Sequence, residues 1–463
     1  MVGLLVLVTA VAFEAQAVST AMPAVAADLG QLDLYAWAFT AFMIPQILAI
    51  VWAGRLCDDV GPTRPMQAGV AVFALGVVIS ALAWSMPVFL AGRFVQGFGG
   101  GLLNLALMVV VGRAFPPEDT GRVMTYFSFA WMMPSFLGPS VAAWIVRVSE
   151  WPFVFWGVLP FVLAGVVLLG PALAQVDLPG LRATGTTPAT LRCALAAAVG
   201  VGLIQASGQT LGWWSAPLAV AGIALVASCL RGLMPVGWTP LGAGLPAVIA
   251  VRALATGAFF GASAFLPLML VRLRGEELAT AGYVLTVSSL GWTFGSWLQS
   301  RAWLLISRDA IVTLGAVIVA TGLGLVSVFT YVTALPVPVV IGGATLAGMG
   351  MGLVSSSTSI LVMQLSQERQ LGRNTGSLQV AEAMGNALVA GVAGTVFVWF
   401  KQGVPDAGLT SGLLVQAFGA PSVLVAACAL LGVWFSRRLG FVPNLSARGP
   451  SGGPHRGAGQ SGK

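Results

Sequence analysis

Long runs of apolar residues, separated by short polar breaks, extend through this sequence from residue 2 to residue 435. A helix that crosses the roughly 30 Å hydrocarbon core of a bilayer needs about 20 such residues. Hydrophobic residues make up 57% of the chain and charged residues 8%, so a water-soluble core could not enclose this much apolar surface. The sequence therefore predicts an all-α polytopic membrane protein with fourteen transmembrane helices. The runs are 2–26, 35–53, 66–85, 88–112, 123–146, 152–173, 190–208, 214–230, 248–271, 280–303, 310–332, 337–363, 375–400 and 413–435.

The two ends of the chain need separate interpretation. Near the N-terminus, Ala15-Gln16-Ala17 is similar to a signal-peptidase site, but no basic segment precedes it and the apolar run continues to Ala27. We therefore expect this run to be the first membrane helix. Residues 444–463 are rich in Gly, Ser and Pro and contain the single histidine, His455, so we expect a disordered tail.

The distribution of basic residues predicts the orientation. With the N-terminus in the cytoplasm, seventeen of the 22 Lys and Arg residues fall on the cytoplasmic side, four fall outside, and Arg93 lies within a run. Because cytoplasmic loops are enriched in Lys and Arg, we expect an inner (plasma) membrane protein with both termini cytoplasmic. The net charge of +7 is then a topology signal and not a nucleic-acid surface. The cytoplasmic set is Arg55, Arg64, Arg113, Arg122, Arg182, Arg192, Arg231, Arg252, Arg301, Arg308, Arg369, Arg373, Arg437, Arg438, Arg448, Arg456 and Lys463, and the outer set is Arg147, Arg272, Arg274 and Lys401.

An arginine and several glycines share one face of the fourth run, in the segment Arg93-Phe94-Val95-Gln96-Gly97-Phe98-Gly99-Gly100. At about 100° per residue, Arg93, Gly97, Gly100 and Asn104 fall on the same side of a helix. An arginine inside a membrane helix costs several kcal/mol unless it is paired or hydrated, so we expect a partner for Arg93. The alternative is an Arg93 side chain that extends to the outer interface.

Two further segments carry charge at a predicted helix end or inside a predicted helix: residues 54–61, Gly-Arg-Leu-Cys-Asp-Asp-Val-Gly, and residues 13–23, which contain Glu14. Together with the Arg93 segment they resemble the major facilitator superfamily, and in particular its fourteen-helix drug:H+ antiporters. Residues 54–61 are similar to the signature loop between helices 2 and 3, the Arg93 segment to the helix 4 motif, and residues 13–23 to the acidic segment of helix 1. The resemblance implies two six-helix bundles plus two additional central helices. We expect bundles at 1–173 and 247–440, the additional pair at 174–246, and a disordered cytoplasmic tail at 441–463.

Weaker echoes of these motifs occur later in the chain. Gly348-Met349-Gly350-Met351-Gly352 is similar to the glycine-rich helix 4 segment, and residues 295–301 fall where a second copy of the helix 2–3 loop is expected, without its aspartate. In the fifth run Gly138-Pro139 matches the antiporter motif of the family and implies a kink and close packing. That motif is only half present, since the family usually has Gly where Pro134, Ala142 and Ala143 stand.

The resemblance also assigns a conformational role to the loop between the second and third runs. Gly54 and Gly61 would allow close helix ends, and Asp58 and Asp59 would oppose a helix macrodipole. Arg113 stands where the family tends to place an acid. We therefore expect Arg113 to pair with Asp58 or Asp59.

Two carboxylates, Glu14 and Glu382, lie inside apolar runs. Since burying an ionised carboxylate is costly, such a group can alternate between its protonated and ionised forms. We predict that Glu14 is the main proton carrier, with Arg93 adjusting its proton affinity, and that Glu382 is a second carrier. The alternative for Glu382 is an interhelical hydrogen bond with no role in turnover. Gln379 and Asn386 share the helical face of Glu382 and would line a polar side of the substrate cavity.

Several other side chains are candidates for that cavity. Polarisable Met and aromatic residues suit an adaptable apolar pocket, although each one can equally be a packing or lipid-facing residue. Gln16 lies about 200° around its helix from Glu14, so we expect it to serve helix packing instead. The cavity candidates are Trp131, Met132, Met133, Phe259 and Phe260, with Asn104.

These observations predict a proton-coupled antiporter that exports small lipophilic compounds, including cationic ones. The alternatives are a proton-coupled uptake symporter of the same fold and a membrane scaffold or sensor without transport. We expect small-molecule substrates, protons and the lipid bilayer as partners, no nucleic acid, and a monomer. The four cysteines lack metal-ligand spacing and no catalytic set stands out, so we expect no cofactor, no metal and no enzymatic activity.

Overall fold

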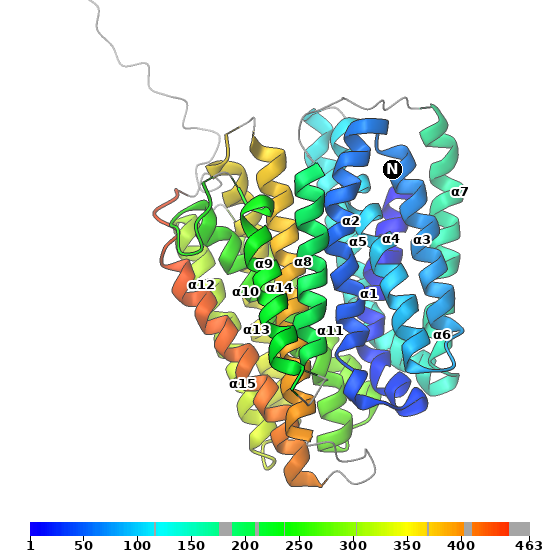
Figure 1. Ribbon diagram of the computed structural model, residues 1–463, viewed down its shortest axis with the longest axis vertical. Coiled ribbons are helices and arrows are strands. Elements are labelled where there is room, and N and C mark those ends of the chain that lie inside the picture. The colour runs from blue at the N-terminus through cyan, green and yellow to red at the C-terminus, as the bar shows by residue number, and fades with distance from the viewer. Residues whose placement is uncertain are drawn as a thin grey trace, which may run out of the picture.

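The structure, a computed structural model, consists of helices with no strand in the part of the chain that it describes (Figure 1). That part comprises residues 1–114, 117–175, 188–208, 213–235, 237–301, 303–367, 370–401 and 410–443. Every predicted apolar run overlaps a helix, and the sixth run is divided between two, which confirms the all-α membrane fold. The helices are α1 (Val2–Leu29), the 3-10 turn η1 (Leu32–Leu34), α2 (Trp37–Val60), α3 (Thr63–Ala81), α4 (Met86–Ala114), α5 (Pro117–Val148), α6 (Pro152–Trp156), α7 (Leu159–Gln175), α8 (Pro188–Ser207), α9 (Ser215–Leu233), α10 (Leu245–Arg274), α11 (Leu278–Gln299), α12 (Arg308–Tyr331), α13 (Val337–Leu365), α14 (Leu371–Lys401) and α15 (Ser411–Ser436).

Twelve of the described helical segments are long and apolar enough to cross a membrane. The two predicted crossings outside this group are α5 and α11, of 32 and 22 residues. At 1.5 Å per residue they extend about 48 and 33 Å, which is sufficient for a roughly 30 Å core. Both pack against other helices, α5 mainly on α1 and α11 mainly on α13. The fourteen predicted crossings thus have helices of adequate length, twelve of which are also strongly apolar.

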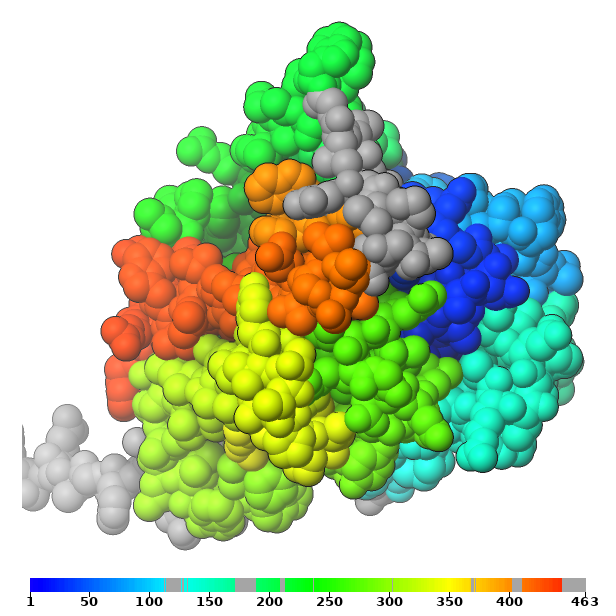
Figure 2. All heavy atoms as spheres, turned by 90° about the horizontal axis from the view of Figure 1, so that it is seen from below, coloured from blue at the N-terminus to red at the C-terminus, as the bar shows by residue number. Residues whose placement is uncertain are grey.

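The helices pack in two groups. Helices α1 to α7 contact mainly one another, and so do α10 to α15. Figure 1 shows α8 between α2 of the first group and α14 of the second, and α8 packs against both. Helix α9 packs mainly on α8, and Figure 2 shows the green atoms of this hairpin projecting from one side of the molecule. We refer to α1–α7 as the first group and to α10–α15 as the second group.

Glycines bring helix backbones into direct contact where the motifs predict close packing. A methyl group added at Gly97 of α4 would collide with the carbonyl of Phe42 in α2. In the second group, Gly348 and Gly352 of α13 lie equally close to carbonyls of α11. A side chain at these positions would push the helices apart, so the glycines determine how closely they approach.

The two groups are joined at the end of the molecule opposite Met1, which we call the closed end. Lys401 Nζ lies 2.9 Å from Asp33 Oδ1. The Tyr35 hydroxyl donates to the Ala264 carbonyl at 2.9 Å. Gly394 packs directly onto Ala36, because both residues are small. In Figure 2, viewed from this end, blue and cyan atoms of the first group lie against green atoms of the second.

A further contact lies about two turns deeper, on α5 and α11. The hydroxyls of Ser140 and Thr286 are 3.1 Å apart, and Gly282 packs onto the Pro139 carbonyl. Among the described residues, three side-chain contacts of this kind join the two groups: the Ser140–Thr286 hydrogen bond, the Tyr35–Ala264 hydrogen bond and the Lys401–Asp33 ion pair.

The C-terminal region differs from one expectation. Residues 441–443 were expected to belong to the disordered tail, but Val442 accepts a hydrogen bond from Arg308 N at 2.9 Å and donates one to Asp309 Oδ1 at 3.1 Å. The remainder of the predicted tail, 444–463, lies outside the described residues.

Candidate functional site

A buried ion pair joins α1 and α4. Glu14 is fully buried, and Arg93 Nη1 donates to Glu14 Oε1 and, at 2.7 Å, to Gln96 Oε1. Arg93 Nε donates to the Ala38 carbonyl at 3.0 Å, and the guanidinium lies over the ring of Phe42, 4.6 Å from its centre. The expectation that Arg93 has a partner inside the membrane is therefore confirmed, and that partner is Glu14.

The cluster around this pair retains unused hydrogen-bonding capacity. Glu14 Oε2 and Gln96 Nε2 are buried and have no hydrogen-bond partner in the described structure, and the same holds for the Thr20 hydroxyl on the next turns of α1. Each buried polar atom left without a partner costs about 1–3 kcal/mol. A free carboxylate oxygen in this position can accept a proton, which makes the cluster chemically suited to protonation.

A second ion pair joins α10 and α14. Arg252 Nε and Nη2 both donate to Glu382 Oε2, at 3.1 and 2.9 Å. Arg252 Nη1 donates to the Ser355 carbonyl at 2.6 Å and to the Thr358 hydroxyl at 3.2 Å, both on α13. Arg252 was counted among the cytoplasmic basic residues that set the topology, and its partner inside the bundle was not predicted. It lies two turns inside α10 with an 11% exposed side chain, because Glu382 compensates its charge there.

The predicted polar face of α14 is directed toward the first group. An added methyl at Gly385 would meet the Ala253 carbonyl of α10, whereas Gly394 packs onto Ala36 at the start of α2. At about 100° per residue, Glu382 and its neighbours on the same face, Gln379 and Asn386, lie between these two directions. They therefore face the space between α10 and α2, where the two groups meet. Asn386 is 9% exposed, and its Oδ1 is buried with no partner among the described residues.

Residues 54–60, which were expected to form a loop, are the last two turns of α2, and they contain the ion pair predicted for this segment. Arg113 Nη2 of α4 lies 3.8 Å from Asp58 Oδ1, while Asp59 pairs with Arg55 one turn earlier at 3.4 Å. Gly61 ends α2 with φ 82°, a conformation that glycine adopts readily, and its N–H donates to the Cys57 carbonyl. The predicted contact between Arg113 and Asp58 is confirmed.

The equivalent loop of the second group uses a neutral partner. Arg308 is fully buried, and its Nη1 donates to Oε1 of Gln299, which stands at the end of α11 in place of an acid. Arg308 was counted among the basic residues of the cytoplasmic side, and it is the first residue of α12. There it is packed between the ends of α11 and α12 and the C-terminal segment.

The helix 5 motif lies at two helix interfaces. Gly138 approaches Gln16 of α1, and Gln16 Nε2 donates to Ser135 Oγ at 3.5 Å. The next residue, Pro139, presents its carbonyl to Gly282 of α11. Gln16 thus takes part in helix packing, as predicted, and Gly138-Pro139 stands where α5 meets both α1 and α11 of the second group.

The remaining cavity candidates are dispersed. Asn104 on α4 and Met132 on α5 are half-buried, and Met133 is exposed. Phe260 is half-buried and packs with Phe259 and Trp292 in an aromatic cluster between α10 and α11. The side chain of Trp131 lies outside the described part of the chain.

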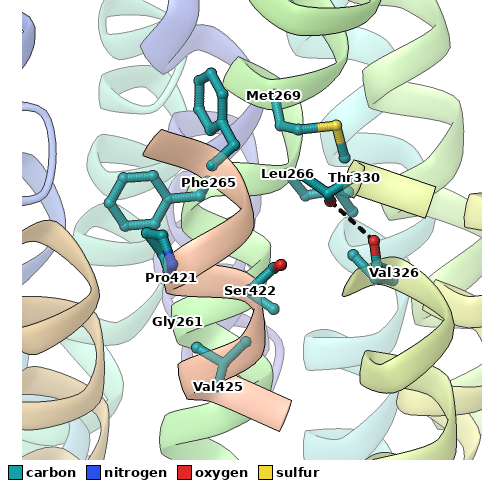
Figure 3. A pocket seen from close by; sticks show the side chains of 11 residues that line it. Gly261, Phe265, Leu266, Met269, Val326, Thr330, Pro421, Ser422 and Val425 are labelled. Carbon is teal, nitrogen blue, oxygen red and sulfur yellow. Dashed lines mark hydrogen bonds between the residues drawn. The ribbon is translucent and has the colours of Figure 1, made fainter. Parts of the chain in front are cut away.

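Two hollows in the structure lie away from these residues. The one in Figure 3 is bordered by α10, α12 and α15, with Met269, Thr330 and Ser422 around it, and holds about 30 Å³, room for one water molecule. The other, of about 710 Å³, lies between α1, α3, α6 and α7 and is lined by apolar side chains and Gln67. Several of its residues, such as Leu163, are exposed on the outer face of the first group, so this hollow opens toward lipid. Neither hollow is lined by a predicted cavity residue.

Comparison with known proteins relates this architecture to transporters. The family model described as Major Facilitator Superfamily matches residues 4–390. Multidrug transporter protein MdtP of Bacillus subtilis is 28% identical over 171 residues, which is 37% of this chain and 32% of that protein. Multidrug resistance protein B homolog of Mycobacterium tuberculosis is 25% identical over 388 residues, 80% of this chain and 71% of that protein. The chain thus spans about a third of the length of the first relative.

Solved structures share the fold over nearly the whole chain. The crystal structure of D-xylose-proton symporter has a TM-score of 0.67 at 14% identity and covers 96% of this chain and 97% of its own. The crystal structure of a POT family transporter in complex with 5-aminolevulinic acid has a TM-score of 0.68 at 14% identity, with 95% and 96% covered. At this level of identity the similarity concerns the fold alone.

Proposed function

The chain belongs to the Major Facilitator Superfamily, and from this premise we propose that it is a proton-coupled antiporter that exports small lipophilic compounds, including cationic ones. It is a membrane transporter and not an enzyme, because its family consists of transporters and its named relatives are transporters. The observation that carries the proposal is the presence of two carboxylate–arginine pairs within the membrane-spanning helices. The multidrug names of the relatives support lipophilic compounds as substrates.

The division of the chain supports alternating access. We assign the bundles to residues 1–173 and 247–440, with the additional helices at 174–246, because α1–α7 and α10–α15 pack mainly among themselves. The side-chain contacts between the two groups are at the closed end. With both termini in the cytoplasm of a plasma-membrane protein, as the distribution of basic residues indicates, the closed end faces outward, and at the cytoplasmic end the described residues of the two groups form no side-chain hydrogen bond or ion pair with each other.

The two carboxylates differ in their access to protons. Glu14 is fully buried, whereas the Glu382 side chain is 26% exposed and has a free oxygen, Oε1. Glu382 can therefore exchange a proton in this conformation, and Glu14 gains access when the helices move. Because each acid is paired with an arginine, protonation weakens that pair and so changes which conformation is favoured. One proton moving inward at 100 mV supplies roughly 2.3 kcal/mol to drive export.

Two contacts on the cytoplasmic side and at the bundle interface would control the conformational change. The Arg113–Asp58 pair holds α4 to the end of α2, where Gly54 lies within the helix and Gly61 ends it. Gly138-Pro139 forms part of the contact between α5 and α11. Asn104, Met132, Met133, Phe260 and Trp131 belong to helices that would line the substrate path as the groups separate.

Transport by the purified full chain in proteoliposomes tests this function. With substrate loaded in the compartment equivalent to the cytoplasm, export should acidify that compartment as protons enter in exchange. If substrate and protons instead enter the cytoplasmic compartment together, so that it acidifies as substrate accumulates there, the chain is an uptake symporter. A chain that moves neither protons nor compounds, tested with a cationic, a neutral and an anionic panel, would be a scaffold or sensor. The transport rate should be unchanged by reconstitution at low density, as expected for a monomer.

A further inference from the structure

Helices α3 and α7 border the larger of the two hollows, and glycines explain why these helices do not close on each other. An added methyl at Gly69 of α3 would meet the backbone of Leu103 in α4, and one at Gly165 of α7 would meet Leu7 of α1. Each helix therefore packs mainly on a different partner, α3 on α4 and α7 on α1. The two are neighbours at one edge of Figure 1 but contact each other little, which leaves the hollow of about 710 Å³ that we call the α3–α7 groove.

The α3–α7 groove has the depth of one membrane leaflet. Its lining on α3 runs from Met66 to Ala74, and on α1 it includes Leu7, in the second turn of that helix. From Arg64, in the first turn of α3, to Ala74 the helix rises about 15 Å, which is half of a roughly 30 Å hydrocarbon core. The lining is apolar except for Gln67, near the start of α3. The groove therefore suits an acyl chain from the leaflet in which α3 starts.

An arginine without a partner stands at the end of the groove. Arg64, Gln67 and Ala71 are all exposed, and at about 100° per residue they fall within about 60° of one another on α3. Because Gln67 and Ala71 line the groove, Arg64 continues the same face of the helix toward the membrane surface. Arg64 forms no hydrogen bond or ion pair with another residue that the structure describes.

The charges around Arg64 favour an anion. The nearby acids at the end of α2 already have partners, Asp58 in Arg113 and Asp59 in Arg55. Three arginines and two aspartates leave this end of the first group with a net charge of +1. Helix α3 also starts with no acidic residue in its first turn and no side-chain cap, so its first N–H groups and its dipole favour a phosphate as well.

We propose that the α3–α7 groove binds one acyl chain of a phospholipid with a single negative charge, of the phosphatidylglycerol type, and that Arg64, Gln67 and the first turn of α3 bind its phosphate. With both termini in the cytoplasm, this lipid belongs to the cytoplasmic leaflet, where anionic lipids occur. The bound chain fills the space between α3 and α7 and holds the two helices at their present distance. This site is independent of the direction and the coupling of transport.

A photoreactive lipid tests the position of the chain. Phosphatidylglycerol with a diazirine in one acyl chain is added to the purified full chain in detergent micelles, and the labelled peptides are mapped by mass spectrometry. Labelling should concentrate on the groove-lining segments of α3 and α7. Equal labelling of every lipid-facing helix would overturn the proposal.

Competition tests the headgroup. Dioleoyl phosphatidylglycerol should displace the photoreactive lipid at a concentration about fivefold lower than dioleoyl phosphatidylcholine, as expected for one arginine at the membrane surface. The free anion sn-glycerol 3-phosphate, which has no acyl chain, should not compete. Equal competition by the two phospholipids, or competition by sn-glycerol 3-phosphate, would contradict an anionic lipid as the ligand.

A variant that fills the groove distinguishes the site from general lipid contact. Gly170 of α7 lines the groove, and an added methyl there meets no other atom. Gly170→Phe should therefore occupy the groove without a clash at its Cβ and abolish the labelling of α3. Gly202→Phe is the matched control, because Gly202 of α8 has equally open space outside the groove. Thermal unfolding verifies that both variants fold, and full labelling of folded Gly170→Phe would refute the site.

A charge variant tests the headgroup contact and leaves the groove intact. Arg64→Gln should retain labelling of α3 and α7 but lose the preference for phosphatidylglycerol over phosphatidylcholine. Arg192→Gln removes an exposed arginine near the start of α8 and should retain that preference. A preference unaffected by Arg64→Gln would refute the proposal even if Gly170→Phe did not fold. None of these measurements requires transport, so a chain that binds the lipid but moves no compound would contradict only the proposed function.

Discussion

The ammonium of Lys401 lies 2.9 Å from the carboxylate of Asp33, although 368 positions separate the two residues in the chain. Lys401 ends α14 and is 3% exposed, whereas Asp33 lies in the turn between α1 and α2. The pair joins the first and second groups at the closed end, beside the hydrogen bond from Tyr35 to Ala264. Any movement that opens this end must separate Lys401 from Asp33.

Removing the charge of Lys401 should therefore favour opening of the closed end. Asp33 is half exposed, so Lys401→Met should shift the equilibrium by about 1 kcal/mol, or about fivefold. Labelling of a cysteine at Ser140 by a membrane-impermeant thiol reagent measures this, with the four native cysteines replaced. The exchange Asp33→Lys with Lys401→Asp should return labelling toward the parent rate. A rate unaffected by Lys401→Met would show that the pair does not hold this end closed.

The Glu14–Arg93 pair should show strong coupling in unfolding measurements. Arg93→Gln leaves a buried carboxylate without its cation and should cost about 3–5 kcal/mol of stability. Adding Glu14→Gln removes the unpaired charge and should recover more than half of this loss. A double-mutant cycle on unfolding in detergent provides the coupling energy, and additive effects of the two changes would contradict a direct pair.

Gly97 should be intolerant of even one added carbon. Gly97→Ala would place a methyl group against the Phe42 carbonyl and should destabilise the fold by about 1–3 kcal/mol. Gly324 of α12 has open space around it, so Gly324→Ala is a matched control that should be neutral or stabilise by about 0.5–1 kcal/mol. Thermal unfolding of the two variants compares them directly. Equal effects would show that α2 and α4 can separate without cost.

Charge reversal at Arg113 should slow transport without unfolding the chain. Arg113→Asp would place two acids together beside Asp58, and the pair is partly exposed, so the cost in stability should be below about 1 kcal/mol. The export rate should fall several-fold, with the amount of folded protein unchanged. Asp58→Arg combined with Arg113→Asp should recover the rate, and failure to recover would assign Arg113 another partner.

Sequence patterns predicted the helices well because apolar runs of membrane-spanning length have few alternative structures. The Arg113–Asp58 contact and a partner for Arg93 were also predictable, since both arginines stand where charge is costly or where the family motif has changed. The partner of Arg252 was not predicted for a physical reason: Arg252 lies near the end of an apolar run, where the sequence of an arginine that reaches water and that of one that pairs inside the bundle look alike. Only the packing of α14 against α10 distinguishes them. In the same way, no sequence pattern near Lys401 or near Asp33 indicates that the two residues pair, because 368 positions separate them.

Closure by small residues has an electrical consequence. Gly394 packs onto Ala36, and Gly282 onto the Pro139 carbonyl, with no side chain between them. At these two contacts between described residues, no room remains for a water molecule that could pass a proton from one helix surface to the next. Molecules resting in this conformation should insulate the bilayer, so that a cell containing many copies would keep its proton-motive force between transport cycles.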